Sequence, residues 1–243
     1  MALIRKLDKP DRIHFYLTEQ YSCSYIKGYQ ARSKVASPPH LINYDSYNNL
    51  IEKGFRRSGV FSYKPYCDKC SSCIPIRIPV YNFFPNKTKK RTYKKLKKNL
   101  VVRSEELSFN EEHFLLYKKY QSTRHSGSGM DQDNRNEYSQ FLLTSNVKTE
   151  LVTFRDKSNI LKMVCIFDIL KNGMSSVYTF FSPDEKSSSY GTYGILWQIE
   201  ECKKRNLSFL YLGYWINQSS KMVYKTRFRP YQMFNKGLWT TYK

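Results

Sequence analysis

The stretch SSVYTFFSPDEKSSSYGTYGILWQIEECKKRNLSFLYLGYWINQSSKMVYKTRFRP, residues 175–230, decides the fold that we expect for this chain. It predicts a strand at residues 175–181, where apolar and aromatic side chains alternate. Pro183 ends this strand, because proline cannot donate the hydrogen bond that a ladder needs. A second strand is predicted at 207–214, which carries no charge.

A helix is predicted between these strands, and a turn of small residues at 187–194 opens it. Ile195, Ile199 and Cys202 share one face of this helix, and acid–base pairs four residues apart stabilise the other. Such a turn presents unpaired backbone N–H groups and the positive end of the helix dipole, which suits a phosphate or a developing oxyanion. The same pattern is typical of a strand–helix–strand crossover without a ligand, and the residues alone leave both interpretations open.

Length and composition indicate a folded protein with a large core. The 243 residues are 40% hydrophobic and include 21 tyrosines, 15 phenylalanines and three tryptophans. No apolar run approaches the ~20 residues that span a bilayer, and the first residues lack the apolar segment of a signal peptide. We therefore expect a cytoplasmic protein without a membrane partner. Its six cysteines are then expected to be thiols or metal ligands and not disulfides.

The charge predicts a polyanionic partner. Lysine and arginine total 41 against 20 acids, a net charge of +21, which favours nucleic acid first and an anionic membrane second. Residues 86–103 contain nine basic residues and no acid: Lys87, Lys89, Lys90, Arg91, Lys94, Lys95, Lys97, Lys98 and Arg103. We expect this run to bind phosphates, although a charge run is also typical of a solvated face. It also predicts a boundary between an N-terminal cysteine-containing region, 1–103, and a C-terminal domain, 104–243.

Three cysteines with a spacing of three, Cys67, Cys70 and Cys73, predict a site for zinc or an iron–sulfur cluster. A tetrahedral site needs four ligands, and Cys23 is the expected fourth. The alternative interpretation is a cluster of thiols in a reducing compartment. Cys165 and Cys202 lie in strand and helix patterns and are expected in the core.

Several cations and one acid are candidates for chemistry. Arg56 and Arg57 stand between two glycines, and arginines on a short turn present planar donors to a phosphate or carboxylate. Asp168 lies in an otherwise apolar strand, where an acid needs a partner or a raised pKa. A hydrogen-bonded core aspartate and a catalytic acid both remain open for it. Further basic candidates are Arg77 on a predicted edge strand, Arg124 and His125 in a loop of small residues, and Lys225 and Arg227 near a short helix, where Lys221 precedes Lys225 by four residues.

The order of the predicted elements resembles the N-acetyltransferase-like fold. Two helices, from residue 110 and at 136–144, precede three strands at 150–155, 160–170 and 175–181. We therefore predict an α+β fold with a mixed, mostly antiparallel sheet whose central strands splay apart, and with a small cysteine-containing N-terminal region. In that fold the acyl donor occupies the gap between the parted strands. The resemblance concerns the fold alone and specifies no substrate.

Specific motifs resemble the arginyl-tRNA–protein transferase family, in particular its bacterial leucyl branch. These motifs run from about residue 14 to 240: GFRRSG at 54–59, CxxCxxCxPxRxPV at 67–80, RH at 124–125, VYTFFxP at 177–183, YGTYxILWQIE at 190–200, YLGYWI at 211–216, KMxYK at 221–225 and FRP at 228–230. The resemblance implies a transferase that moves leucine from leucyl-tRNA to proteins beginning with Asp or Glu, within the N-degron pathway of protein degradation. One departure is Ile26, which stands where the eukaryotic arginyl relatives carry a second cysteine, and it puts the metal or cluster of those relatives in question here.

The resemblance also suggests roles for residues. We expect Asp168 and Tyr178 to handle the proton. The acceptor's acidic side chain is expected to meet one of Arg56, Arg57, Arg77, Arg124, His125, Lys225 and Arg227. The aminoacyl-tRNA is expected to contact Lys89, Lys90, Arg91, Lys94, Lys95, Tyr190, Gly191, Thr192, Tyr193, Tyr214 and Trp215. The reaction itself is expected to need no cofactor, since an α-amine is partly unprotonated at neutral pH and the ester is activated. We expect a monomer.

Three other functions fit parts of the sequence. An arginyl-tRNA donor or an acetyl-CoA-dependent acetyltransferase would use the same fold. The acetyltransferase is expected to carry more glycines in its phosphate turn than Gly191 and Gly194. A metal-stabilised RNA-binding protein without enzymatic activity would use the cysteines and the basic run, and would leave residues 175–230 without a purpose.

Overall fold

An eight-stranded mixed sheet forms the centre of the computed structural model, which describes residues 12–127, 129–185 and 188–243. Its strand order is β14-β13-β7-β12-β11-β10-β9-β8, and every neighbouring pair except β11 and β12 is antiparallel. The strands are β7 (Ile74–Pro79), β8 (Val101–Glu105), β9 (Thr149–Arg155), β10 (Leu161–Ile169), β11 (Gly173–Phe181), β12 (Phe209–Trp215), β13 (Tyr231–Asn235) and β14 (Leu238–Tyr242).

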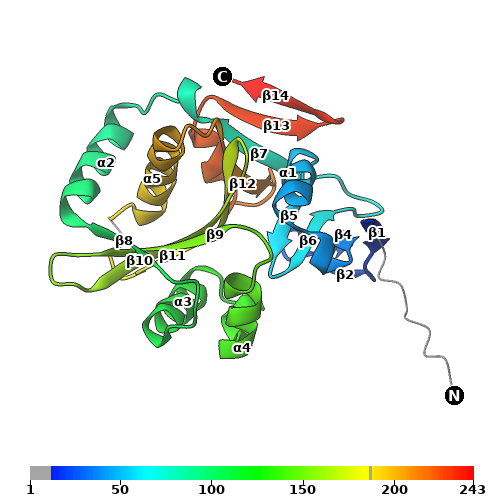
Figure 1. Ribbon diagram of the computed structural model, residues 1–243, viewed down its shortest axis with the longest axis horizontal. Coiled ribbons are helices and arrows are strands. Elements are labelled where there is room, and N and C mark those ends of the chain that lie inside the picture. Colours follow the sequence, from blue (N-terminus) through cyan, green and yellow to red (C-terminus); the bar gives the residue numbers. More distant parts are fainter. Residues whose placement is uncertain (1–11, 128, 186–187) are drawn as a thin grey trace, which may run out of the picture.

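Helices cover both faces of this sheet (Figure 1). On one face lie α2 (Lys87–Asn99) and α5 (Tyr190–Lys204), which pack on a large apolar core that includes Phe154 and Trp197. On the other face lie α3 (Glu111–Arg124) and α4 (Arg135–Tyr138), which a π turn continues to Leu143. The basic run is therefore mostly a helix: Leu96 is buried, Tyr93 packs against the core, and most of the lysines remain exposed.

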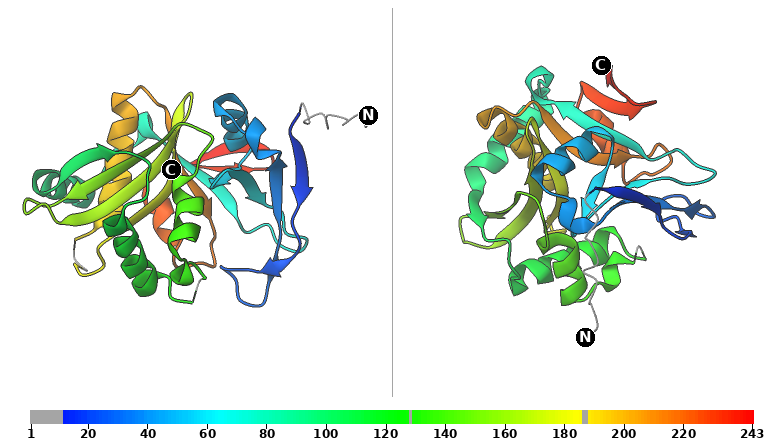
Figure 2. Two further views of the ribbon diagram at one scale, coloured as in Figure 1. Left: turned by 60° about the horizontal axis from the view of Figure 1, so that its bottom comes forward. Right: turned by 45° about the vertical axis from the view of Figure 1, so that its right-hand side comes forward.

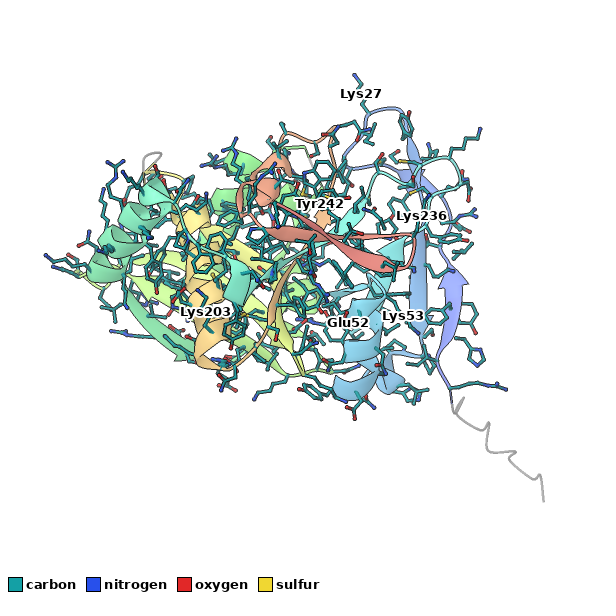
Figure 3. The ribbon with its side chains drawn as sticks, turned by 90° about the horizontal axis from the view of Figure 1, so that it is seen from above. Lys27, Glu52, Lys53, Lys203, Lys236 and Tyr242 are labelled. Carbon is teal, nitrogen blue, oxygen red and sulfur yellow. The ribbon has the colours of Figure 1, made fainter. Side chains whose placement is uncertain are left out.

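A smaller sheet lies beside the large one, at the end where β1 and β4 are seen in Figure 2. Its order is β1-β4-β6-β5, and α1 packs its buried residues against the chain that joins the two sheets. The elements of this part are β1 (His14–Leu17), β2 (Tyr21–Ser22), β3 (Gln30–Ala31), β4 (Ser33–Ser37), α1 (Tyr44–Glu52), β5 (Arg56–Ser58) and β6 (Phe61–Pro65). Figure 3 shows Glu52 and Lys53 at the end of α1, where the indole of Trp239 donates to the carbonyl of Glu52 at 3.1 Å.

The strand β7 is an interior strand, so its predicted place at a sheet edge was wrong. It lies between β12 and β13. β13 pairs only with Ile76 and Arg77 of β7. Pro75 and Pro79 lie outside this pairing, so neither has to donate a hydrogen bond to β13.

The predicted division of the chain at residue 103 does not coincide with the division between the two sheets. Residue 103 falls inside β8, and β7 and α2, which precede it, belong to the large sheet and its helical layer.

The splayed strands expected from the sequence are present. β11 and β12 run parallel but pair only across Gly173–Phe209, Met174–Leu210 and Ser175–Tyr211. Beyond this point β12 bulges, where Gly213 has φ = +77°, a conformation that favours glycine. The α+β, N-acetyltransferase-like prediction is confirmed by this arrangement. No helix of the described residues combines the length and the apolar character that crossing a membrane requires.

Candidate active site

A cavity of about 1420 Å³ lies where β11 parts from β12. Its walls include β5 and the turn after it, the end of α3, residues between 130 and 144, the outer half of β11, the start of α5, and residues 218–225. Both sheets therefore contribute to one hollow, and residues distant in the sequence meet there. Two features of the cavity stand out, an arginine between the parted strands and a buried lysine beside it.

Arg56 reaches from β5 into the gap between β11 and β12. Its Nη2 donates to the carbonyls of Ser176 at 2.6 Å and Val177 at 3.1 Å. On the opposite side it lies so close to Gly213 that a Cβ there would overlap its Nη1. Among the described residues, no carboxylate forms an ion pair with Arg56. The cavity thus contains a fixed guanidinium whose hydrogen-bond partners are neutral carbonyls.

Lys225 lies on η5 (Val223–Arg227), a 3₁₀ turn that lines the cavity. Its side chain is buried, and its Nζ donates to the carbonyl of Tyr214 at 2.5 Å. The pKa of Lys225 is lowered to about 7, first by burial and second by the positive charge of Arg56. A lysine in this state is neutral in a large fraction of molecules at physiological pH.

Three further basic side chains line the same cavity. Arg124 and His125 end α3, and Lys221 comes from the segment before η5. The pKa of His125 is lowered, first by burial and then by the charges of Lys221 and Arg124, so these three groups are neighbours. The sequence predicted Arg124 and His125 at the site, and the structure brings them to it together with Arg56 and Lys225.

Tyr178 also lines the cavity, from β11. Its hydroxyl accepts a hydrogen bond from Nε2 of Gln121 at 2.8 Å. Burial raises the pKa of Tyr178 well above its usual value, so the phenol keeps its proton. In this state Tyr178 is suited to donate a hydrogen bond to an oxyanion and is unsuited to accept a proton.

The N-terminus of α5 opens onto the cavity through Tyr190, Gly191 and Thr192. Ser189 precedes the helix with φ = +58°, and its side chain does not cap the first turn. Within the described residues, the N–H groups of that turn are thus left for water or a ligand. Tyr193 differs from the prediction, because it points into the core, where its ring centre lies 5.6 Å from that of Tyr93.

Asp168 and Arg57 form a buried ion pair at the wall of the cavity, where Arg57 is part of the lining and Asp168 lies behind it. Arg57 Nε and Nη2 bond both oxygens of Asp168 at 2.9–3.1 Å, and Tyr47 and Thr149 also donate to this carboxylate. Asp168 is fully buried and does not line the cavity. These contacts do not support a catalytic Asp168 or an acceptor-binding Arg57, since each side chain is occupied by the other.

Arg77 and Arg227 are also placed away from the cavity lining. Arg77 forms an ion pair with Glu52 at 2.9 Å, donates to Gln232 at 2.7 Å and lies 3.7 Å from the ring centre of Phe209. It joins the α1 segment to β7 and β13, and its donors are satisfied there. Arg227 lies at the end of η5, close enough to Lys89 for its charge to lower the pKa of that lysine, after the effect of burial.

The predicted tRNA-binding residues fall into two groups. Lys89, Lys90, Arg91, Lys94 and Lys95 lie on α2, whose first turn approaches η5: Nζ of Lys89 is 5.4 Å from the ring centre of Phe228. A basic surface therefore runs from α2 through Arg227 to the segment that lines the cavity. Tyr214 and Trp215 are not part of this surface. The phenol of Tyr214 is buried and donates to the carbonyls of Gly54 and Tyr63, and Trp215 packs against the core.

The four predicted metal ligands lie near one another. The pKa of the Cys73 thiol is raised to about 12, first by burial and then by Cys67, Cys23 and Cys70. Four thiols are a donor set that suits zinc or an iron–sulfur cluster. In the part of the chain that the structure describes, however, no three His, Cys, Asp or Glu side chains are arranged as the ligands of one metal ion. A metal would have to draw the sulfurs together, and the metal site stays a prediction.

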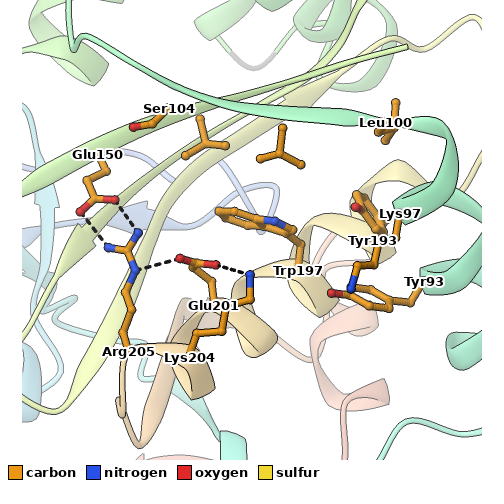
Figure 4. Close-up of a pocket in the computed structure, with 12 residues that line it drawn as sticks. Tyr93, Lys97, Leu100, Ser104, Glu150, Tyr193, Trp197, Glu201, Lys204 and Arg205 are labelled. Atoms are coloured by element: carbon orange, nitrogen blue, oxygen red, sulfur yellow. Dashed lines mark hydrogen bonds and ion pairs between the residues drawn. The ribbon is translucent and has the colours of Figure 1, made fainter. Parts of the chain in front are cut away.

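A second, smaller cavity of about 410 Å³ lies between α2, α5 and the edge of the sheet (Figure 4). Its polar groups are paired with each other: Arg205 bonds Glu150 at 2.8 Å and Glu201 at 3.0 Å, and Lys204 bonds Glu201 at 3.0 Å. These charges neutralise one another, and the remaining cation of the lining, Lys97, has its Nζ 5.7 Å from the ring centre of Tyr93.

Comparison with known proteins gives two matches to family profiles. The profile of "Arginine-tRNA-protein transferase, C terminus" matches residues 112–235, and that of the N terminus matches residues 21–91. The chain belongs to the arginine-tRNA–protein transferase family.

Relatives within this family share much of the sequence. Two proteins named aspartate/glutamate leucyltransferase, from Thiobacillus denitrificans and Nitrosospira multiformis, are 49% and 47% identical to this chain. The first match covers 94% of both chains, and the second covers 93% of this chain and 90% of the relative. A third protein of that name, from Pseudomonas putida, is 40% identical over 95% of this chain and 97% of its own. The similarity to this family therefore extends over the residues of both sheets.

Sequence reasoning missed several cavity residues of this family member. Lys221, Tyr25, Tyr63 and Tyr224 line the cavity, and none was predicted as a site residue. The signal for Lys221 was its spacing of four from Lys225. The tyrosines gave no signal, because a chain with 21 tyrosines offers no way to choose among them before the two sheets are placed side by side.

Proposed function

We propose that this chain is an aminoacyltransferase that moves leucine from leucyl-tRNA to the N-terminal Asp or Glu of acceptor proteins. The observation that carries the proposal is the position of Arg56 in the gap between β11 and β12, without a carboxylate partner among the described residues. A cation at this point suits an acceptor whose first side chain is a carboxylate. The relatives that match almost the whole chain are named for the same two acceptor residues.

The donor end of the reaction fits the other walls of the cavity. The uncapped N-terminus of α5 suits a phosphate near the end of the tRNA, and the phenol of Tyr178 suits the oxygen of the ester carbonyl as negative charge develops on it. The basic surface that leads from α2 to η5 suits the phosphates of the acceptor stem. Arg124 and Lys221 add positive charge beside this path.

The chemistry needs positioning more than a strong catalyst. The acceptor's α-amine attacks the ester carbonyl, and a hydroxyl of the terminal ribose leaves. The ester is already activated, so aligning amine and carbonyl and stabilising the oxyanion supply most of the acceleration. No step is assigned to the cysteines, which do not line the cavity.

The test is a transfer assay with two labelled donors and a set of acceptors. Radiolabelled leucyl-tRNA and arginyl-tRNA are each incubated with peptides that begin with Asp, Glu, Asn or Ala. We expect leucine on the Asp and Glu peptides, no transfer after ribonuclease treatment, and no acetylation with acetyl-CoA. Transfer of arginine in place of leucine would assign the chain to the other branch of the family, and ribonuclease-resistant acetylation would overturn the proposal.

A further inference from the structure

We propose that Lys225 takes the proton from the α-ammonium group of the acceptor, and that the acceptor's own carboxylate promotes this transfer by neutralising Arg56. The inference rests on the proposed function, because it concerns the same acceptor. It assigns a proton acceptor to a cavity that Asp168, held by Arg57, does not line and in which Tyr178 keeps its proton.

The surroundings of Lys225 are those of an amine that is unprotonated for part of the time. Its Nζ donates to the neutral carbonyl of Tyr214, and among residues 12–127, 129–185 and 188–243 no carboxylate pairs with it. A fully buried ammonium without an anion is costly, so it loses its proton more readily than an exposed lysine. The neutral amine would keep one N–H on Tyr214 and leave a lone pair for a proton.

Few groups act electrostatically on Lys225, and each comes from a different element. On β5 it is the guanidinium of Arg56, whose charge lowers the pKa of Lys225. On β12 it is the carbonyl of Tyr214, a dipole without charge. On η5 itself it is Tyr224, whose ring centre lies 6.0 Å from Nζ and whose phenol stays neutral because burial raises its pKa. Arg56 is therefore the charge that controls the proton affinity of Lys225.

An acidic acceptor would change this balance. When its carboxylate binds Arg56, the repulsion between Arg56 and Lys225 weakens, and the pKa of Lys225 rises from about 7 toward that of the α-ammonium, about 7.7–8.0. Proton transfer between the two amines is then nearly balanced in free energy, which suits general base catalysis. With a neutral first residue the charge of Arg56 would have no anionic partner, and Lys225 would remain a weaker base. Acceptor choice and proton transfer are thereby coupled.

The step balances as follows. The neutral amine of Lys225 takes one proton from the α-ammonium, and the freed electron pair of that nitrogen forms a bond to the ester carbon. The carbonyl π pair moves to oxygen, and it returns as the bond to the ribose oxygen breaks. The nitrogen gives a second proton to that leaving oxygen and keeps the third in the new amide. Lys225 then releases its proton to water.

The test compares the pH dependence of kcat/KM for leucyl transfer to an Asp peptide in three proteins: the natural chain, Lys225→Met and Lys225→Arg. For the natural chain we expect a rise with an apparent pKa near 7. For both variants we expect the rise to shift to about 8, where the acceptor amine deprotonates by itself. The variants would then be about tenfold slower than the natural chain at pH 7, since one pKa unit is a factor of ten, and nearly equal to it at pH 9. Arginine keeps the charge but not the ability to release a proton.

A second acceptor separates proton transfer from positioning. A peptide whose terminal amine is replaced by an aminooxy group, which is unprotonated at pH 7, should react at similar rates with the natural chain and with Lys225→Met. Lys236→Met is the matched control, because Lys236 is exposed at the β13–β14 turn (Figure 3) and is not part of the cavity lining.

Thermal unfolding checks that the variants fold. A lysine whose pKa is depressed by folding destabilises the folded state below its unfolded pKa of about 10.5, and the effect is complete at and below about pH 7. Lys225→Met should therefore unfold at the same or a higher temperature at pH 7, an advantage that disappears toward pH 10.5.

The outcomes are distinguishable. If the natural chain transfers leucine and Lys225→Met and Lys225→Arg show its unshifted pH profile, Lys225 is not the proton acceptor, whereas the proposed function stands. A loss of rate that is equal at pH 7 and pH 9 and equal for the aminooxy peptide would assign Lys225 a positioning role and overturn the inference. If the natural chain transfers leucine to no acidic peptide, the proposed function fails, and this inference fails with it.

Discussion

Arg57 Nη2 lies 2.9 Å from Asp168 Oδ1, and both side chains are almost completely buried. Arg57 belongs to β5 of the small sheet and Asp168 to β10 of the large one, so this ion pair joins the two parts of the molecule. Tyr47 from α1 and Thr149 from β9 complete the contacts of the carboxylate. The neighbouring Arg56 faces the cavity because successive residues of a strand point to opposite sides.

Breaking this pair should destabilise the fold. We expect Asp168→Ala to lower the free energy of unfolding by about 3–5 kcal/mol, because it leaves the Arg57 charge buried without a partner. Chemical denaturation monitored by tryptophan fluorescence measures this loss. The control is Asp45→Asn, which breaks the exposed pair with Lys171 and should leave the midpoint nearly unchanged. A stable but inactive Asp168→Ala protein would return Asp168 to the catalytic candidates.

Gly213 should be required for the position of Arg56. An alanine there would need φ = +77°, which costs about 1–2 kcal/mol, and its Cβ would overlap the guanidinium. We expect Gly213→Ala to raise KM for Asp peptides at least tenfold while the affinity for leucyl-tRNA changes little. Glycine-to-alanine change at Gly237, where a Cβ meets nothing within 4 Å and φ is also positive, controls for the backbone cost. Equal KM in both variants would separate Gly213 from acceptor binding.

The exposed lysines of α2 should set the salt dependence of tRNA binding. Lys90 and Lys94 are exposed and lie one helical turn apart. Changing both to glutamine should weaken binding at low salt and reduce the slope of log K against log salt by roughly 0.7–0.9 for each phosphate that is no longer neutralised. Filter binding at several salt concentrations measures this slope. Lys53→Gln with Lys236→Gln removes the same charge from the far end of the molecule (Figure 3) and should leave the slope unchanged. Equal slopes for both double variants would exclude α2 from the interface.

The cysteines give a separate prediction. If Cys23, Cys67, Cys70 and Cys73 bind zinc or a cluster, then protein purified without oxygen contains it, and Cys67→Ser loses it. Cys202→Ser is the control, since Cys202 lies on α5 and is buried in the apolar core. Metal analysis and absorbance spectra measure both. Colourless, metal-free protein that transfers leucine at the full rate would remove the metal from this account.

Much of the large sheet was predictable because its signals are local. β9, β10, β11 and β12 begin and end within two residues of their predicted ends, where turns such as Lys171–Gly173 interrupt the apolar pattern. The place of β7 was not predictable, because it depends on pairing with β12 and β13, which lie more than 120 residues away. Its two prolines are typical of an edge strand, and only the short pairing with β13 permits them inside.

The candidate site shows the same division. The sequence identified the segments that line the cavity, and five of the seven predicted acceptor-binding residues line it: Arg56, Arg57, Arg124, His125 and Lys225. The sequence offered no means to distinguish Arg56 from Arg57. Neighbouring residues of a strand point to opposite faces, but the sequence does not show which of the two faces contains a carboxylate. That outcome depends on Asp168, which lies 111 residues further along the chain than Arg57.

The central claim is that Arg56 binds the acceptor's first carboxylate beside the ester of the tRNA. The most direct measurement is the ratio of kcat/KM for leucyl transfer to two peptides that differ only in beginning with Asp or Asn, in the natural chain and in Arg56→Met. We predict that the natural chain prefers Asp on the order of 10- to 100-fold, the value of a charged hydrogen bond, and that Arg56→Met loses this preference. An Arg56→Met protein that is slower with both peptides but keeps the full preference for Asp would contradict the account.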